Sequence, residues 1–103
     1  MKDPKAPIGV FDSGVGGLTV LKALRRLLPR EEFLYFGDTA RVPYGGKPLA
    51  MVRRFAWEIA GFLLRQGVKA IVVACNTASS AALPDLAEDL SVPVFGVVEP
   101  AAR

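Results

Sequence analysis

The sequence predicts an α/β domain built on a four-stranded parallel sheet with helices on its faces. Short apolar runs alternate with longer helical patterns along the chain, in the order β-α-β-α-β-α-β, which favours parallel strands joined by right-handed crossovers. The run Ala70 to Ala74 has no polar alternation, as expected of a strand covered on both faces. The 103 residues are 51% hydrophobic and 22% charged, which suits one globular domain.

The first half of the chain predicts two strands and a helix. Residues Ile8 to Phe11 form an apolar run that ends at Asp12-Ser13-Gly14. A helix is expected from Leu18 to Leu28, ended by Pro29. Its leucines fall on one helical face; they are Leu18, Leu21, Leu24, Leu27 and Leu28. Phe33 to Phe36 is the second predicted strand.

A long helix is predicted from Leu49 to Gln66, with Pro48 at its first position and Gly67 at its end. Its inward positions are Val52, Phe55, Ile59, Phe62 and Leu63. After the third strand, Thr77 to Leu90 reads as helical, and Pro84 is expected to break or kink that helix. Val92 to Val98 is the fourth strand, starting near Pro93.

Composition excludes several classes of function. The net charge of +3 is too small to indicate nucleic acid binding, and the pairs Arg25-Arg26 and Arg53-Arg54 fit solvated helix faces. No apolar run approaches the roughly 18 residues of a membrane span, and the N-terminus has no apolar stretch of a secretory signal. The chain has no histidine and one cysteine, so we expect no metal, a reducing compartment and a cytoplasmic location.

Polar and glycine-rich segments follow each predicted strand. They are residues 12–17, residues 37–39 and 43–46, residues 75–77, and Glu99-Pro100. Because parallel strands point the same way, these segments must gather at the carboxyl edge of the sheet, where open α/β sheets bind ligands. The sequence therefore predicts a site at this edge.

Cys75 is the best candidate for chemistry, because it ends a buried strand immediately before a predicted helix. The positive end of that helix would stabilise a thiolate. The structural alternative is an inert buried thiol. Asn76 and Thr77 suit binding of a carboxylate at the helix start, and equally suit plain capping.

The remaining candidates are weaker. Asp12 is expected to orient a substrate ammonium or to modulate Cys75, or only to form a turn. Gly14-Val15-Gly16-Gly17 lacks the spacing of a dinucleotide or phosphate loop, which disfavours nucleotides but leaves flavodoxin-like phosphate binding open. Tyr44 is a pocket wall or a turn aromatic, while Trp57 is expected in the core and Asp38 as support for its loop.

Taken together, four strings of sequence resemble the glutamate racemases of the aspartate/glutamate racemase family. They are residues 9–17 (GVFDSGVGG), 37–45 (GDTARVPYG), 74–79 (ACNTAS) and 96–100 (GVVEP). The resemblance implies a flavodoxin-like, doubly wound domain over residues 1–103 that is the N-terminal half of a two-domain racemase. It implies no cofactor, and a role in supplying D-glutamate for peptidoglycan and the cell wall.

By that resemblance, Cys75 is one of two catalytic cysteines and serves the D-glutamate face, and Asp12 is a supporting carboxylate. Ser13, the Tyr44-Gly45 pair, Asn76 and Thr77 would contact the substrate, L- or D-glutamate. A second cysteine on the opposite face is needed because one base would return the proton to the face it came from.

The chain has no second cysteine. We therefore expect the isolated chain to fold without racemising glutamate at an appreciable rate, and to need the other half of the racemase. We also expect the face that the other half would normally cover to be partly apolar and to favour a homo-oligomer. The alternatives are an aspartate racemase domain, a non-catalytic half-domain acting through self-association, and a phosphate-ligand domain.

Overall fold

The computed structural model describes residues 3–13, 17–41 and 46–96. Strands and helices alternate in the predicted order. The elements are β1 (Ile8–Asp12), α1 (Gly17–Leu27), β2 (Phe33–Gly37), the short 3-10 helix η1 (Thr39–Arg41), α2 (Leu49–Arg65), β3 (Ala70–Val73), α3 (Asn76–Asp89) and β4 (Val94–Gly96). The predicted α/β class is thus confirmed, with element ends shifted by a residue or two.

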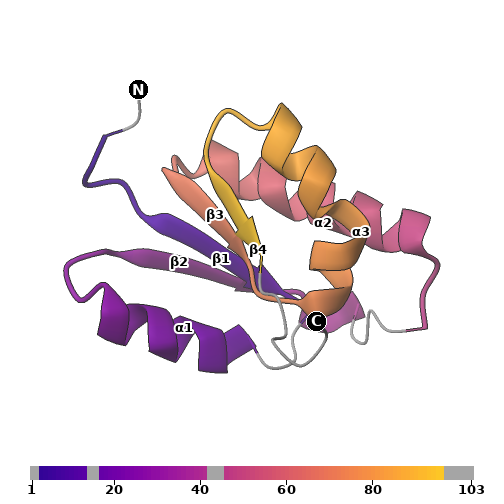
Figure 1. Ribbon diagram of the computed structural model, residues 1–103, viewed down its shortest axis with the longest axis horizontal. Coiled ribbons are helices and arrows are strands. Elements are labelled where there is room, and N and C mark those ends of the chain that lie inside the picture. Colours follow the sequence, from indigo (N-terminus) through magenta and orange to yellow (C-terminus); the bar gives the residue numbers. More distant parts are fainter. Residues whose placement is uncertain (1–2, 14–16, 42–45, 97–103) are drawn as a thin grey trace.

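The four strands form one parallel sheet in the order β2-β1-β3-β4. Figure 1 shows the carboxyl ends of the strands at one edge of the sheet, where α1 and α3 begin. This order is the flavodoxin-like one, in which the winding reverses direction between β1 and β3. The doubly wound parallel sheet expected from the sequence is therefore confirmed.

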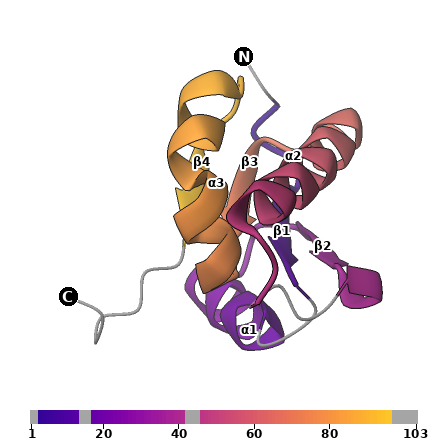
Figure 2. The same cartoon turned by 90° about the vertical axis from the view of Figure 1, so that its right-hand side faces the viewer.

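The molecule has three layers, with α1 on one face of the sheet and α2 and α3 on the other (Figure 2). The larger apolar cluster lies under α2 and α3, and the smaller one lies under α1. Strand β3 serves both, since Ile71 and Val73 join the larger cluster while Ala70 and Val72 pack against the smaller. The prediction that this strand is covered on both faces is confirmed.

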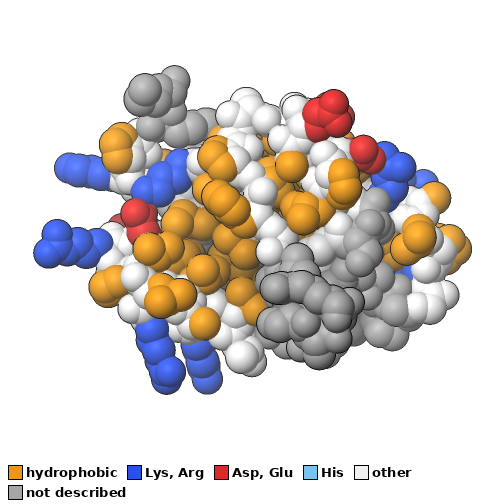
Figure 3. Space-filling view, in the orientation of Figure 1, with side chains coloured by type: hydrophobic (Ala, Val, Ile, Leu, Met, Phe, Trp, Pro, Cys, Tyr) orange, Lys and Arg blue, Asp and Glu red, His pale blue; other side chains and the backbone are white. Residues whose placement is uncertain are grey.

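The apolar face of α1 is only partly covered. Leu21 and Leu24 pack against the smaller cluster, but Leu18, Leu27 and Leu28 are 57%, 75% and 41% exposed. A groove of about 300 Å³ lies beside them, and Val20, Leu24, Phe33, Val72 and Phe95 are among its lining residues. Figure 3 shows hydrophobic side chains gathered there, between α1 and β4. An exposed apolar surface is therefore present beside α1, and its coverage by the other half of a racemase stays a prediction.

Helix α2 follows the prediction closely. Four of its five predicted inward residues are buried, whereas Phe62 is 36% exposed. Pro48 stands just before the helix as its N-cap residue, not at the first helical position. Gly67 follows the C-cap residue Gln66 with a φ of +84°, a conformation in which glycine avoids the steric cost of a side chain.

The expected break at Pro84 is wrong, because α3 runs unbroken from Asn76 to Asp89. Proline removes one backbone hydrogen bond from a helix interior. Here Ala78, Ala82 and Leu86 are fully buried on both sides of the proline, and tertiary packing of this kind holds a helix together against local propensity.

Strand β4 begins at Val94, two residues later than predicted, and is described as far as Gly96; Val97 and Val98 lie outside the described residues. Trp57 packs against the larger apolar cluster as expected. Within the described ranges, no helix combines the length and apolar character that crossing a bilayer requires.

Candidate active site

The candidate site lies at the carboxyl ends of β1 and β3, the two strands between which the winding of the sheet reverses. Phe11 is paired with Val73, and the Ala74 N–H donates to the Phe11 carbonyl over 2.8 Å. Asp12 and Cys75 therefore end neighbouring strands. Open α/β sheets bind ligands in the crevice at this reversal point, so two residues predicted from the sequence stand where a ligand is expected.

Cys75 is the N-cap residue of α3 and has an extended backbone. Its thiol is free and its residue is 8% exposed. The Ser79 N–H donates to the Cys75 carbonyl over 2.8 Å, and the Ser79 hydroxyl donates to the Val73 carbonyl over 3.2 Å. These contacts tie the first turn of the helix to the strand before it, and so fix the sulfur at the junction.

Asp12 is fully buried at the end of β1. The Tyr35 hydroxyl of β2 donates to Asp12 Oδ1 over 2.9 Å, and the Asp38 N–H donates to the Asp12 carbonyl over 3.0 Å. Burial, followed by the hydrogen bond to Asp12 and the charge of Asp12, raises the pKa of Tyr35 from 10.0 to about 12. At neutral pH the phenol is therefore protonated and acts as the donor.

The side chains of Asp12 and Cys75 lie on opposite sides of the sheet. Cys75 belongs to the apolar cluster under α2 and α3, whereas Asp12 bonds Tyr35, which packs against the cluster under α1. Alternation along a strand places them so. The segments after β1 and β3 thus lie at the same edge of the sheet, as predicted. A ligand must lie across the strand ends to reach both Asp12 and Cys75.

Asp38 and Arg41 brace the segment after β2. Arg41 Nε lies 2.8 Å from Asp38 Oδ2, Arg41 Nη1 lies 2.6 Å from Glu58 Oε1, and the guanidinium carbon stands 3.9 Å from the Phe55 ring centroid. Hydrogen bonding to Glu58 is the largest cause that raises the pKa of Arg41 above its ordinary value. The expected supporting role of Asp38 is confirmed, since its carboxylate holds Arg41 of η1, and Arg41 in turn bonds Glu58 of α2.

Several predicted site residues are placed only in part. Ser13 is buried, 6% exposed, directly after β1. Asn76 and Thr77 form the start of α3, but their side chains are outside the described part of the chain, as are Tyr44 and Gly45 entirely. The substrate contacts predicted for these five residues stay predictions.

Tyr35 was not among the residues predicted from the sequence, although it contacts one of them. Its contact with Asp12 could be predicted only from the register of β1 and β2. In that register Tyr35 pairs with Val10, which lies two residues before Asp12 on the same face of the sheet. Gly17 was considered above only as part of the glycine-rich segment after the first strand. In the structure it makes room for Asp12, since a Cβ at residue 17 would lie 1.7 Å from Asp12 Oδ2.

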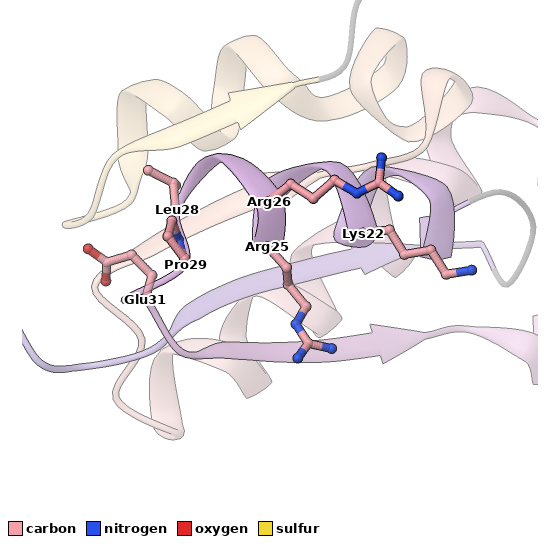
Figure 4. Close-up of a pocket in the computed structure, with 6 residues that line it drawn as sticks. All are labelled: Lys22, Arg25, Arg26, Leu28, Pro29 and Glu31. Atoms are coloured by element: carbon pink, nitrogen blue, oxygen red, sulfur yellow. The ribbon is translucent and has the colours of Figure 1, made fainter.

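A second hollow, of about 450 Å³, lies along α1 away from this edge. Figure 4 shows Lys22, Arg25 and Arg26 pointing in different directions around it. Because these cations diverge, they fit the solvated helix face expected from the sequence and do not form a site for one anion. Among the described residues, no three His, Cys, Asp or Glu side chains are grouped to hold a metal ion.

The fold and this edge define a flavodoxin-like α/β domain with a ligand site at the carboxyl ends of its strands, and comparison with known proteins identifies its family. The chain belongs to the Asp/Glu/hydantoin racemase family, whose model matches residues 8–103. It is 59% identical over 100 residues to the glutamate racemase of Geobacter metallireducens, which covers 97% of this chain and 37% of that protein.

Solved structures agree with this placement. A glutamate racemase isoform from Bacillus anthracis superposes with a TM-score of 0.91 at 50% identity, covering 98% of this chain and 38% of that one. The glutamate racemase of Francisella tularensis, solved in complex with D-glutamate, gives a TM-score of 0.83 at 50% identity, over 89% and 35% of the two chains. The chain thus spans well under half the length of the proteins it matches.

Proposed function

We propose that this chain forms the Cys75-bearing part of a glutamate racemase. The observation that carries the proposal is the position of Asp12 at the end of β1 and of Cys75 between β3 and α3, beside the reversal point of the sheet. The relatives of matching sequence are named glutamate racemase, and one similar structure holds D-glutamate. Together these favour glutamate over aspartate as the substrate.

The reaction inverts one carbon. The Cys75 thiolate removes the α-proton of D-glutamate, so that an S–H bond forms as the Cα–H bond breaks and the electron pair stays on the substrate. A second thiol then delivers a proton to the opposite face and becomes a thiolate. Atoms and charge balance without any oxidation, and the two bases have exchanged protonation states.

This scheme requires a second acid from outside the chain, because Cys75 is its single cysteine and histidine is absent. Without an electron sink, the carbanion character at Cα must be stabilised by fixed hydrogen bonds and charges. The start of α3 next to Cys75 offers backbone N–H groups for the substrate carboxylate. Near-complete burial of the sulfur favours the exclusion of water that such stabilisation needs.

The test joins this chain to the portion of the Geobacter metallireducens enzyme that it does not match, and follows the optical rotation of L- and D-glutamate. We expect the fused protein to racemise glutamate and to leave aspartate unchanged. We expect the isolated chain to show no appreciable racemisation of glutamate. Robust racemisation by the isolated chain would contradict the requirement for a second acid. Turnover of aspartate in preference to glutamate would favour an aspartate racemase.

A second role is favoured by the exposed apolar groove beside α1. A chain that presents such a surface is expected to self-associate, in keeping with a non-catalytic half-domain. Failure of the fused protein to racemise any amino acid, combined with a stable dimer of the isolated chain, would support this role in place of catalysis.

A further inference from the structure

The buried carboxylate of Asp12 is surrounded by residues that fit it closely. Tyr35 donates its hydroxyl to Oδ1 over 2.9 Å. On the side of Oδ2, residue 17 has no side chain, and a Cβ there would overlap that oxygen at 1.7 Å. The backbone carbonyl of Asp12 is occupied by the Asp38 N–H. Asp12 is therefore held by its backbone and by its carboxylate.

The geometry of the sheet explains why Tyr35 reaches this carboxylate. Tyr35 pairs with Val10 and Gly37 pairs with Asp12, so the phenol must extend along the strand past residue 37. A Cβ on Gly37 would lie 2.9 Å from the Tyr35 hydroxyl and 3.2 Å from its ring. Glycine at position 37 thus leaves the space through which the phenol reaches Asp12.

Resting on the proposed function, we propose that Tyr35 is a positioning residue that fixes the Asp12 carboxylate at the substrate edge, with Gly17 and Gly37 clearing the space for this pair. Tyr35 acts through Asp12 and needs no contact with the substrate. A hydrogen bond from a neutral donor holds a carboxylate in one orientation while leaving its negative charge in place. That charge is what a substrate ammonium requires.

The protonation state of Tyr35 supports this role. A raised pKa means that folding favours the protonated phenol. The contribution that the buried, hydrogen-bonded phenol makes to stability is therefore complete below pH 10, where the phenol is protonated in the folded and unfolded chains alike, and it is lost as pH rises from 10.0 to about 12. The Tyr35 hydroxyl consequently keeps its proton throughout the pH range in which one cysteine can act as a thiolate base and another as a thiol acid.

The first test is a double-mutant cycle in the fused racemase described above, using Tyr35→Phe, Asp12→Ala and the double variant. Loss of a hydrogen bond to a charged group predicts that Tyr35→Phe lowers kcat by about 10- to 100-fold with a smaller change in KM. In the Asp12→Ala background the same change should alter kcat less than about twofold, because its effect passes through Asp12. Phe33→Leu, a packing change on the same strand and face, is the matched control and should leave kcat near that of the parent.

The second test needs no activity. In the isolated chain with Tyr44→Phe, the carbon signal next to the Tyr35 hydroxyl is titrated by NMR. We expect a midpoint near 12 that falls toward 10.0 with Asp12→Asn, remaining somewhat above it because burial persists. An unchanged midpoint would overturn the Tyr35–Asp12 pair itself.

The two tests separate the possible failures. If the parent fusion does not racemise glutamate, the proposed function fails, while the titration still decides whether Tyr35 holds Asp12. If the parent is active and Tyr35→Phe lowers kcat by the same factor in the Asp12→Ala background as in the parent, Tyr35 does not act through Asp12 and the positioning role is wrong.

Discussion

The tightest contact in the site concerns Gly17, and replacing it with alanine tests the geometry around Asp12. The new Cβ would stand 1.7 Å from Asp12 Oδ2, half the 3.4 Å at which ordinary contact begins. The carboxylate is fully buried and bonded to Tyr35, so it has little room to withdraw. Overpacking of this kind costs about 1–3 kcal/mol, more than the gain of at most about 1 kcal/mol from replacing glycine in a helix.

The assay is urea unfolding of the isolated chain, with Gly61→Ala as the matched control. At Gly61 in α2 the nearest heavy atom to an added Cβ is Arg65 Nη1 at 3.5 Å, so that variant should gain about 0.5–1 kcal/mol. Gly17→Ala should instead lose about 1–2 kcal/mol, or roughly 4–16 °C in Tm for a domain of this size.

A second variant links the loss to the carboxylate. In an Asp12→Ala background, the cost of Gly17→Ala should fall, because Asp12 Oδ2 and Cγ, which would lie 1.7 and 2.3 Å from the new Cβ, are gone and only the Cβ of residue 12, at 2.8 Å, remains close. If Gly17→Ala is as stable as Gly61→Ala, or if its cost is the same with and without the Asp12 carboxylate, the close approach described here is refuted.

Three further outcomes follow from the fold. Arg41→Ala should lower the free energy of unfolding by about 1–3 kcal/mol, because the buried carboxylate of Asp38 loses a charge-assisted hydrogen bond. In the same urea series, Arg54→Ala at an exposed position should change the free energy of unfolding by less than about 0.5 kcal/mol. Equal losses in the two variants would contradict the bracing role of Arg41. Pro84→Ala should raise stability by about 1–3 kcal/mol by restoring a hydrogen bond inside α3, and a loss in thermal unfolding would show that the proline is needed there. The isolated chain should self-associate in sedimentation experiments. Phe95→Lys, at a position that is 58% exposed and lines the apolar groove, should weaken that association. A chain that stays monomeric at all concentrations would exclude self-association through this groove.

The sequence determines the order of elements well because that order depends on local patterns. The apolar run at residues 70–74 is too short to favour a helix and has no polar alternation, and β3 forms there over Ala70–Val73, between the two helical layers. Alternation of strands and helices then restricts the sheet to parallel pairing with crossovers on both faces. The strand order β2-β1-β3-β4 is one of the two common windings of doubly wound sheets.

Features that depend on contacts between distant segments were harder to predict. The leucines of α1 form the predicted face, but periodicity says which side of a helix is apolar and not what covers it; Leu27 is 75% exposed. Tyr35 could be linked to Asp12 only by knowing the register of β1 and β2. The local preferences of proline predict a helix break at Pro84, but the packing of the buried residues around it keeps α3 continuous.

The candidate site shows the same division. Placement of Cys75 at the junction of β3 and α3 was predicted from neighbouring residues alone. That its side chain and the Asp12 carboxylate lie on opposite sides of the sheet follows from strand alternation once the strand ends are fixed. A substrate bridging these two groups must therefore span the reversal point of the sheet.

The central claim is that the Cys75 sulfur exchanges the α-proton of glutamate. It is tested most directly by incubating the fused racemase and its Cys75→Ala variant with D-glutamate in deuterium oxide and following the α-proton signal by NMR. We predict that the parent replaces the α-proton with deuterium and that the folded variant does so no faster than a blank. Exchange by the variant at a rate close to that of the parent would contradict the claim.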